Sequence, residues 1–357
     1  MRTVAIVDTS ICTDNLGDEI IMDAVNQVVW ELFPDAYVFR VPSHEALSDR
    51  THKFIGEASY CFIGGTNLLS SRIEPYGLWR LRLEDAYRYG GAHTVCLGTG
   101  WNDYMPRPTE HTAKILRTAL TSDLIHSARD GYTREHLAGV GLAAVNTSCP
   151  TTWSLTPDHC RTIPTARAPT AVFTLSAWRP DPAADRAFVD LLRRHYGRLR
   201  FFPQMQNDWD YCRSLGFDDV ALVTPTTEGY TRFLENEEVD VIGTRLHGGI
   251  RALQKGRRAL VLAIDNRATE IGKDTGLPVA ARDDLAAITR WIEGAAPTAL
   301  ALPQDAIDAW KAQFRPEALE RLPRPAPPRF VPEPRRVGLD DVAALTKQVV
   351  KQALGRA

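Results

Sequence analysis

Arg245 and His247 are the residues of this chain whose types and spacing are best suited to chemistry. They stand two positions apart, between a short apolar run, 239–244, and a segment of helical spacing that begins at Gly248. The N-terminus of a helix offers free N–H groups, here including that of Gly248, and a partial positive charge. A guanidinium and a titratable imidazole at that place predict an anion site with a proton donor.

Arg267 follows the next apolar run, 258–264, within the segment Asp265-Asn-Arg267. The carboxyl ends of successive parallel strands lie at the same edge of a sheet. We therefore expect Arg267 on the same edge as Arg245 and His247. Two arginines beside a helix N-terminus suit a small ligand with two or three negative charges better than a neutral one.

Three further strand ends lie in the first part of the chain. In the first, Gly17 allows a tight turn, Asn15 supplies hydrogen-bonding groups and Asp18 can cap the following helix, so both a ligand site and a plain capping turn fit. In the second, Gly64 and Gly65 would let a ligand approach the backbone and its N–H groups.

The third strand end carries the dipeptide Arg129-Asp130. An arginine and an aspartate next to each other fit either a structural ion pair or an anion contact. The pattern favours the ion pair and leaves the anion contact open.

Alternating strand and helix signals are the elements that must position these residues. Strands are expected over 4–7, 38–41, 60–65, 94–98, 171–175, 199–202, 221–223, 239–244 and 258–264, and helices over 18–32, 76–89, 108–121, 133–137, 185–195, 229–236 and 248–255. Such alternation predicts parallel sheets with right-handed crossovers. We expect an α/β fold with two Rossmann-like domains that face each other across a cleft.

The domain boundaries follow from composition. A stretch rich in proline and threonine, 150–170, separates a first domain, 1–165, from a second, 166–322. Six prolines within 323–334 predict an extended strap. A final helix over 340–354, with Val342, Leu345 and Val349 on one side, is expected to pack on the first domain, and a partner-binding role is the alternative.

Composition excludes several classes of protein. The net charge of −2 over 357 residues does not favour nucleic acid or a membrane surface as a partner. The six cysteines have no metal-ligand spacing, so we expect no metal and no cofactor. No secretory signal is visible and no apolar run approaches the roughly 20 residues of a membrane span, so we expect a cytoplasmic protein. P-loop, dinucleotide-binding, zinc-protease and nucleophile-elbow motifs are absent from the sequence.

Taken in order, these motifs resemble the polysaccharide pyruvyl transferase family. The resemblance runs from about Val4 to Pro278 and rests on Asn15-Leu-Gly-Asp18, Gly64-Gly65, Arg129-Asp130 and above all Thr244-Arg-Leu-His247. It implies the fold of the two-domain glycosyltransferases, with the acceptor on the first domain and an anionic donor on the second.

The resemblance also implies an activity: transfer of the pyruvyl group of phosphoenolpyruvate to two hydroxyls of a saccharide or glycoconjugate, which forms a ketal and releases phosphate. Arg245 would then be the donor-binding arginine, His247 the catalytic histidine and Arg129 a second anion contact. His247 would protonate the methylene carbon of the donor. Many family members carry a lysine where Arg267 stands, and an arginine there can hold an anion but cannot carry a proton.

Two other functions remain open. A glycosyltransferase of the same architecture would use a nucleotide sugar, with Arg245 on its diphosphate and Glu228 or Asp240 on its ribose. A non-catalytic relative would bind an anionic saccharide. The sequence also leaves a homo-oligomer open.

Overall fold

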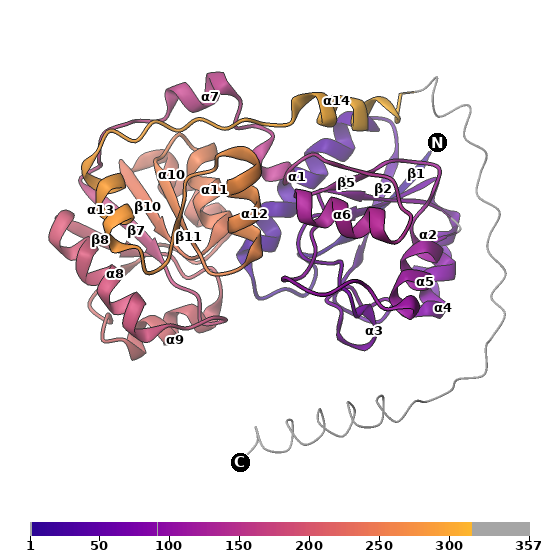
Figure 1. The fold of residues 1–357 in the computed structure, drawn as a ribbon, viewed down its shortest axis with the longest axis horizontal. Coiled ribbons are helices and arrows are strands. Elements are labelled where there is room, and N and C mark those ends of the chain that lie inside the picture. Colours follow the sequence, from indigo (N-terminus) through magenta and orange to yellow (C-terminus); the bar gives the residue numbers. More distant parts are fainter. Residues whose placement is uncertain (1, 91, 316–357) are drawn as a thin grey trace, which may run out of the picture.

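The computed structural model describes residues 2–90 and 92–315. The expected proline-rich strap and the helix over 340–354 lie outside the described residues. The described chain forms two α/β halves that lie side by side (Figure 1).

The first half contains a four-stranded parallel sheet in the order β2-β1-β3-β4. Its strands are β1 (Thr3–Asp8), β2 (Tyr37–Pro42), β3 (Tyr60–Gly64) and β4 (His93–Leu97). Two short parallel strands, β5 (His126–Ala128) and β6 (Ala144–Asn146), continue beyond β4 through a bridge between Thr99 and Ala128. The helices are α1 (Leu16–Leu32), α2 (Asp49–Glu57), α3 (Ile73–Tyr76), α4 (Leu83–Tyr89), α5 (Glu110–Ala119) and α6 (Gly131–Gly139).

The second half contains a six-stranded parallel sheet in the order β12-β11-β10-β7-β8-β9. Its strands are β7 (Thr170–Thr174), β8 (Arg198–Phe201), β9 (Ala221–Leu222), β10 (Val239–Gly243), β11 (Ala259–Ala263) and β12 (Val279–Ala281). The helices are α8 (Pro182–His195), α9 (Gln206–Ser214), α10 (Thr227–Asn236), α11 (Leu246–Gln254), α12 (Asn266–Thr275) and α13 (Leu285–Glu293). The predicted α/β fold with parallel sheets is confirmed.

The segment between the sheets is not a plain linker. It contains a 3₁₀ turn, η1 (Pro150–Thr152), and a short helix, α7 (Pro157–Thr162). Cys149 and Leu155 within it are fully buried and belong to the core of the second half. The segment is therefore packed between the halves and positions residues at their junction.

The long helix expected over 76–89 is wrong in its first half. Only Leu83–Tyr89 is helical, because Asp85 accepts a hydrogen bond from the Arg82 backbone N–H at 3.0 Å and starts the helix there. Trp79 and Leu81 before it are almost fully buried in a non-helical segment. Their burial as loop residues, which the apolar spacing does not distinguish from a helix, explains the difference.

The last described helix, α14 (Gln304–Ala312), returns to the first half (Figure 1). Trp310 and Phe314 are buried against the first sheet, with ring centroids 6.2 Å and 5.3 Å from that of Phe62. The sequence predicts that all residues up to 322 belong to the second domain. The packing places α14 with the first, because these two rings cover one face of its sheet.

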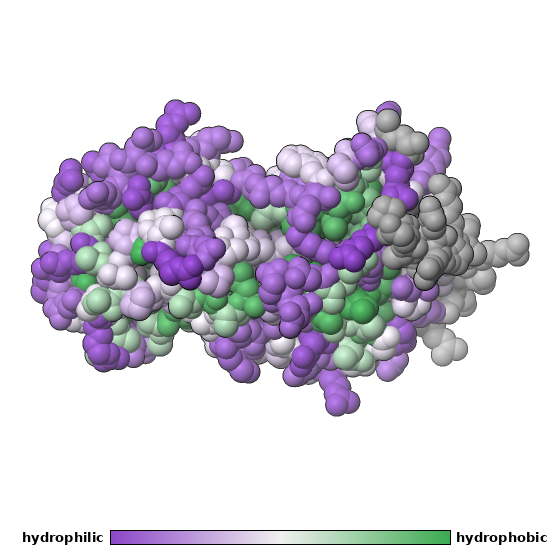
Figure 2. Space-filling model, turned by 90° about the horizontal axis from the view of Figure 1, so that it is seen from above, coloured by the Kyte–Doolittle hydropathy of each residue, from purple (hydrophilic) through white to green (hydrophobic). Residues whose placement is uncertain are grey.

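Hydrophilic residues predominate on the face shown in Figure 2, and hydrophobic residues lie there in small separate patches. Among the described residues, no helix combines the length and the apolar character needed to span a membrane.

Candidate active site

The N-terminus of α1 in the first half faces that of α11 in the second. Gln204, which follows β8, joins them: its Nε2 donates to Asn15 Oδ1 at 2.9 Å and its Oε1 accepts from the Gly248 backbone N–H at 3.0 Å. The Gln204 carbonyl also accepts from Leu16 N at 3.0 Å. Gln204 is buried, so these contacts are shielded from water. Its position after a strand end was the one sequence signal that could have found it.

Asn15 is the N-cap of α1, and its Oδ1 accepts from Gly17 N at 3.0 Å. Asp18 does not cap the helix as predicted. It is buried and accepts hydrogen bonds from Thr13 Oγ1 at 2.8 Å and Thr66 Oγ1 at 3.4 Å. Burial raises the pKa of this carboxyl group, and the nearby charge of Arg267 opposes the rise.

Gly64 and Gly65 make room for packing, and the ligand approach that the sequence predicts there stays a prediction. Gly65 has a φ of +57°, and a Cβ there would lie 2.1 Å from Cγ2 of Ile21 on α1. A Cβ on Gly64 would lie 3.0 Å from Cγ1 of Val25. The two glycines let α1 pack directly on the end of β3, which brings Asn15 to the junction between the halves.

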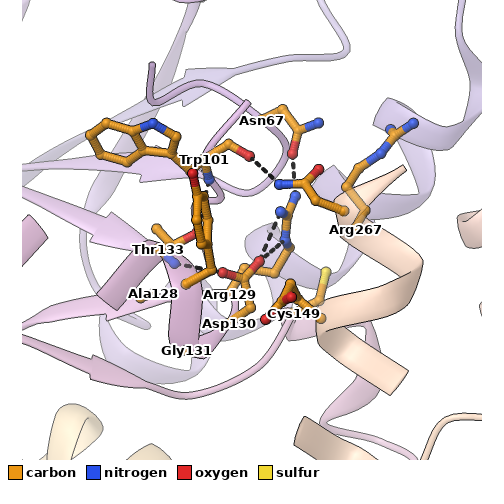
Figure 3. A network of polar contacts seen from close by, with 12 residues as sticks. Asn67, Trp101, Ala128, Arg129, Asp130, Gly131, Thr133, Cys149 and Arg267 are labelled. Carbon is orange, nitrogen blue, oxygen red and sulfur yellow. Dashed lines mark hydrogen bonds and ion pairs between the residues drawn. The ribbon is translucent and has the colours of Figure 1, made fainter. Parts of the chain in front are cut away.

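Arg129, shown with its polar partners in Figure 3, lies directly after β5 and is almost fully buried. Its Nε donates to Asp130 Oδ2 at 2.9 Å, its Nη2 lies 2.8 Å from the same oxygen, and its Nη1 donates to Asn67 Oδ1. A Cβ on Gly100 would meet the guanidinium at 2.2 Å, so this glycine makes room for it. The ion pair expected for Arg129-Asp130 is present, and Nη2 makes no hydrogen bond to any described residue.

Arg267 lies in the first turn of α12 and pairs with Asp265, the N-cap residue. Its Nε is 3.1 and 3.0 Å from the two carboxylate oxygens, and its Nη2 is 2.5 Å from Oδ2. Burial is the largest single influence on the Asp265 carboxyl group and raises its pKa. The charge of Arg267 and its hydrogen bonds together outweigh burial, so the pKa of Asp265 is lowered. Among the described residues Nη1 of Arg267 has no hydrogen-bond partner, so it remains available to an anion.

His247 occupies the second position of α11 and is buried. Its Nε2 lies 3.7 Å from Sγ of Cys149. Burial first, and then the positive charges of Arg267 and Arg129, lower its pKa to about 3. The structure therefore brings His247 together with an arginine from each half, and the imidazole is neutral at pH 7 in the free protein.

Arg245, the N-cap residue of α11, makes a buried ion pair. Its Nε donates to Asp208 Oδ2 at 2.9 Å, and its Nη2 donates to the other oxygen. Asp208 on α9 is fully buried and also accepts from the Ala177 backbone N–H at 3.1 Å. Two of the three guanidinium nitrogens thus bond to a carboxylate of the same half. The contact that the sequence predicts between Arg245 and an anionic ligand is then left to Nη1.

Beside this cluster, a cavity of about 350 Å³ lies between the halves. Helix α12 connects it to the cluster, since Glu270 on its wall is one helical turn beyond Arg267. The lining mixes an aromatic ring, charged groups and an amide, and is formed by Gly131, Tyr132, Arg134, Glu135, Asn146, Glu270, Lys273 and Asp274.

The described residues contain no group of three or more histidine, cysteine or acidic side chains that could hold a metal ion. All six cysteines are free thiols. The chemistry that the cluster can support on its own is therefore anion binding and proton transfer at His247.

Comparisons with known proteins bear on this arrangement. Residues 15–266 match the family described as polysaccharide pyruvyl transferase. No curated protein matches the sequence.

Among solved structures, UDP-GlcNAc 2-epimerase from Methanocaldococcus jannaschii, in complex with UDP-GlcNAc and UDP, is similar with a TM-score of 0.51 at 8% identity, over 85% of this chain and 95% of that one. A putative UDP-N-acetylglucosamine 2-epimerase from Listeria monocytogenes gives a TM-score of 0.51 at 13% identity, over 91% and 98%. At such identities the likeness concerns the fold alone, which is the two-domain GT-B type.

Proposed function

Because the chain belongs to the polysaccharide pyruvyl transferase family and is therefore a transferase, we propose that it transfers the pyruvyl group of phosphoenolpyruvate to two hydroxyls of a saccharide or glycoconjugate. The reaction forms a ketal and releases phosphate. The observation that supports this most is the buried imidazole of His247, on which the positive charges of Arg129 and Arg267 both act.

The donor is a small polyanion with one carboxylate and one phosphate. Arg129 from the first half and Arg267 from the second bind these two groups. Each uses a guanidinium nitrogen that makes no hydrogen bond to a described residue: Nη2 of Arg129 and Nη1 of Arg267. Charge-assisted hydrogen bonds of this kind are short and strong in a buried site. The backbone N–H groups at the start of α11 add to the positive potential.

His247 is the general acid. In the free protein the positive charges of the two arginines disfavour a protonated imidazole. The negative charge of the bound donor offsets them, so binding raises the pKa of His247 and favours its protonated form. The imidazolium then protonates the methylene carbon of the donor, which makes the neighbouring carbon electrophilic.

The first acceptor hydroxyl adds to that carbon, and phosphate leaves with the electron pair of its C–O bond. The second hydroxyl then closes the ketal. Of the two hydroxyl protons, one replaces the proton lost by His247 and the other leaves with phosphate. The acceptor reaches the donor from the cavity between α6 and α12, whose wall offers the ring of Tyr132 and the amide of Asn146.

A glycosyltransferase reaction on a nucleotide sugar has less support. Asp240 was one candidate for the ribose contact. It lies within β10, where it is buried, accepts from Tyr196 Oη at 2.7 Å and faces Arg258 at 3.7 Å. A carboxylate in the body of a strand cannot reach a ligand at the strand's carboxyl end.

The proposal is tested by incubating the protein with phosphoenolpyruvate and a panel of saccharides and measuring phosphate release. We expect release that depends on the acceptor and that falls by about 100-fold or more in His247→Gln, since general acid catalysis contributes roughly 10²–10⁴-fold. His195→Gln, at a histidine that pairs with Glu293 on the other side of the second half, is the matched control and should keep full activity. Release of a nucleotide from a nucleotide sugar, without turnover of phosphoenolpyruvate, would contradict the proposal.

A further inference from the structure

Cys149 is the nearest hydrogen-bonding neighbour of His247, although 98 residues separate the two in sequence. It lies directly before η1, in the segment between the halves, and its side chain is fully buried. Its Sγ stands 3.7 Å from His247 Nε2, which is within the range of a hydrogen bond to sulfur. The proposed reaction does not use this thiol, so its place beside the imidazole requires another explanation.

Two observations bear on the direction of the hydrogen bond between the sulfur and the ring. Thr151 Oγ1 donates to Sγ at 3.1 Å. Burial raises the pKa of the Cys149 thiol, so the group keeps its proton at neutral pH. The sulfur thus receives one hydrogen bond from Thr151 and has its own proton left to donate to Nε2.

The other ring nitrogen, Nδ1, has no hydrogen-bond partner among the described residues. The charged groups that act on the ring come from three elements: Arg129 after β5, Asp265 and Arg267 at the start of α12, and Arg251 on α11 itself. A neutral imidazole that accepts at Nε2 must carry its proton on Nδ1. The nitrogen that bears the proton is then the one to which no described residue hydrogen-bonds.

We propose that Cys149 is a positioning residue which, through its hydrogen bond to Nε2, holds His247 in the Nδ1–H tautomer and fixes the orientation of the ring. Thr151 supports it by donating to one of the two lone pairs of the sulfur, which leaves the S–H bond free to turn toward the ring. Under the proposed function, on which this last step depends, donor binding adds the second ring proton at Nε2, and the thiol turns so that Sγ accepts from Nε2–H. Nδ1 then delivers its proton to the donor, which leaves a neutral ring with its proton on Nε2. A side chain that can donate at position 149 is required, and a hydroxyl would serve as well as a thiol.

The test measures the tautomer directly, by NMR of the protein with ¹⁵N-labelled histidine rings at pH 7 and without donor. His247→Gln identifies the His247 signals by their loss. We expect the Nδ1–H tautomer in the wild type and in Cys149→Ser, and a shift toward the Nε2–H tautomer in Cys149→Ala and in Thr151→Val. Cys212→Ala is the matched control, because this buried cysteine belongs to the core of the second half and, among the described residues, its thiol hydrogen-bonds only to the Phe217 carbonyl, at 3.9 Å. It should leave the signals unchanged.

An Nε2–H tautomer in the wild type would overturn the proposal, and so would an unchanged tautomer in a folded Cys149→Ala variant. If Cys149→Ala does not fold, Thr151→Val and Cys149→Ser still decide the question. These measurements need no substrate, so they stand even if phosphoenolpyruvate is not the donor.

Activity provides the second readout. Where phosphate release from phosphoenolpyruvate is observed, we expect Cys149→Ala to lower kcat by about 10-fold or more, a part of the effect of the acid itself, with KM for the donor nearly unchanged. Cys149→Ser should restore most of kcat. An equal loss in Cys149→Ser and Cys149→Ala would indicate a purely structural role for the thiol and would contradict the proposal.

Discussion

At the scale of single residues, the site is governed by the charge around one imidazole. His247 has no carboxylate as a direct partner among the described residues, and burial and the arginines lower its pKa to about 3. In the free protein it is therefore a poor acid at pH 7. Under the proposed function, an anionic donor bound by Arg129 and Arg267 reverses this balance, so that His247 becomes a competent acid only when the donor is bound.

Arg267→Gln should raise the pKa of His247 in the free protein. Removal of a like charge favours the imidazolium, and the charge of Asp265, no longer paired with Arg267, acts in the same direction. We therefore expect the pKa to rise by about one or more. A pH titration followed by histidine NMR measures the shift. Arg213→Gln, at a surface arginine paired with Asp210, is the control and should change nothing. A pKa that stays constant or falls in Arg267→Gln would show that burial alone sets the value.

The sequence located part of this cluster and not the rest, for a physical reason. Arg245, His247 and Arg267 follow strands of one sheet, and parallel topology places such residues at one edge. Asp208 and Cys149 were missed because their contacts join segments 37 and 98 residues apart in sequence. No local pattern marks a carboxylate or a thiol that meets its partner only in the fold.

At the scale of elements, the site depends on how closely helices approach the ends of strands. Gly65 lets α1 pack on β3. Gly243 in the second half instead lets two strands approach closely at their ends, since a Cβ there would lie 2.2 Å from the Thr174 carbonyl oxygen of the neighbouring strand β7. The sequence predicts a ligand-binding turn at Gly65, because a glycine required for packing and one required for ligand approach look alike in sequence.

Gly65→Ala should lower the free energy of unfolding by several kcal/mol. The substitution has two costs. A left-handed φ costs a non-glycine residue roughly 1 kcal/mol, and the added Cβ would overlap with Ile21, whose Cγ2 lies 2.1 Å away. Gly141→Ala is the matched control, because Gly141 has a φ of +82° but no heavy atom within 4 Å of the added Cβ. Chemical denaturation of the two variants separates strain from overpacking. Equal losses would show that α1 does not rely on this close contact.

Helices were predicted least well where they carry few apolar residues. Helix α12 buries only Ala268 and Ile271 among its apolar side chains, and its remaining contacts are polar. Asp265 caps it and Gly276, in the left-handed region, ends it. Those two signals were present in the sequence, but without an apolar stripe they did not suffice for the prediction of a helix.

At the scale of the whole molecule, polar contacts hold the two halves together. Asp274 on α12 accepts from the Gly131 backbone N–H at 2.8 Å and from Asn146 Nδ2 at 2.7 Å. Tyr104 Oη donates to Glu270 at 2.7 Å. The alternation of strands and helices predicted two parallel sheets, but contacts of this kind follow from the placement of one half against the other, which no periodicity in the sequence describes.

Gln204→Ala should weaken the junction between the halves. It leaves the Gly248 N–H and one acceptor site of Asn15 without their partner, and an unpaired buried polar group costs about 1–3 kcal/mol. We expect a lower unfolding midpoint and faster hydrogen exchange at Gly248. Gln304→Ala, at a glutamine on α14 that bonds only to Asp308 on the surface, is the control. Unchanged exchange at Gly248 would mean that Gln204 does not protect this N–H group.

The return of α14 to the first half has a mechanical consequence. The chain passes between the halves once through the segment of η1 and α7 and again through 294–303, and both passages end in packed structure. A body held at two separate points turns most easily about the line through those points. We therefore expect the space between α6 and α12 to widen by rotation of one half about this line. That rotation would separate Arg129 from Arg267, and the proposed anion site would form again when the halves come back together.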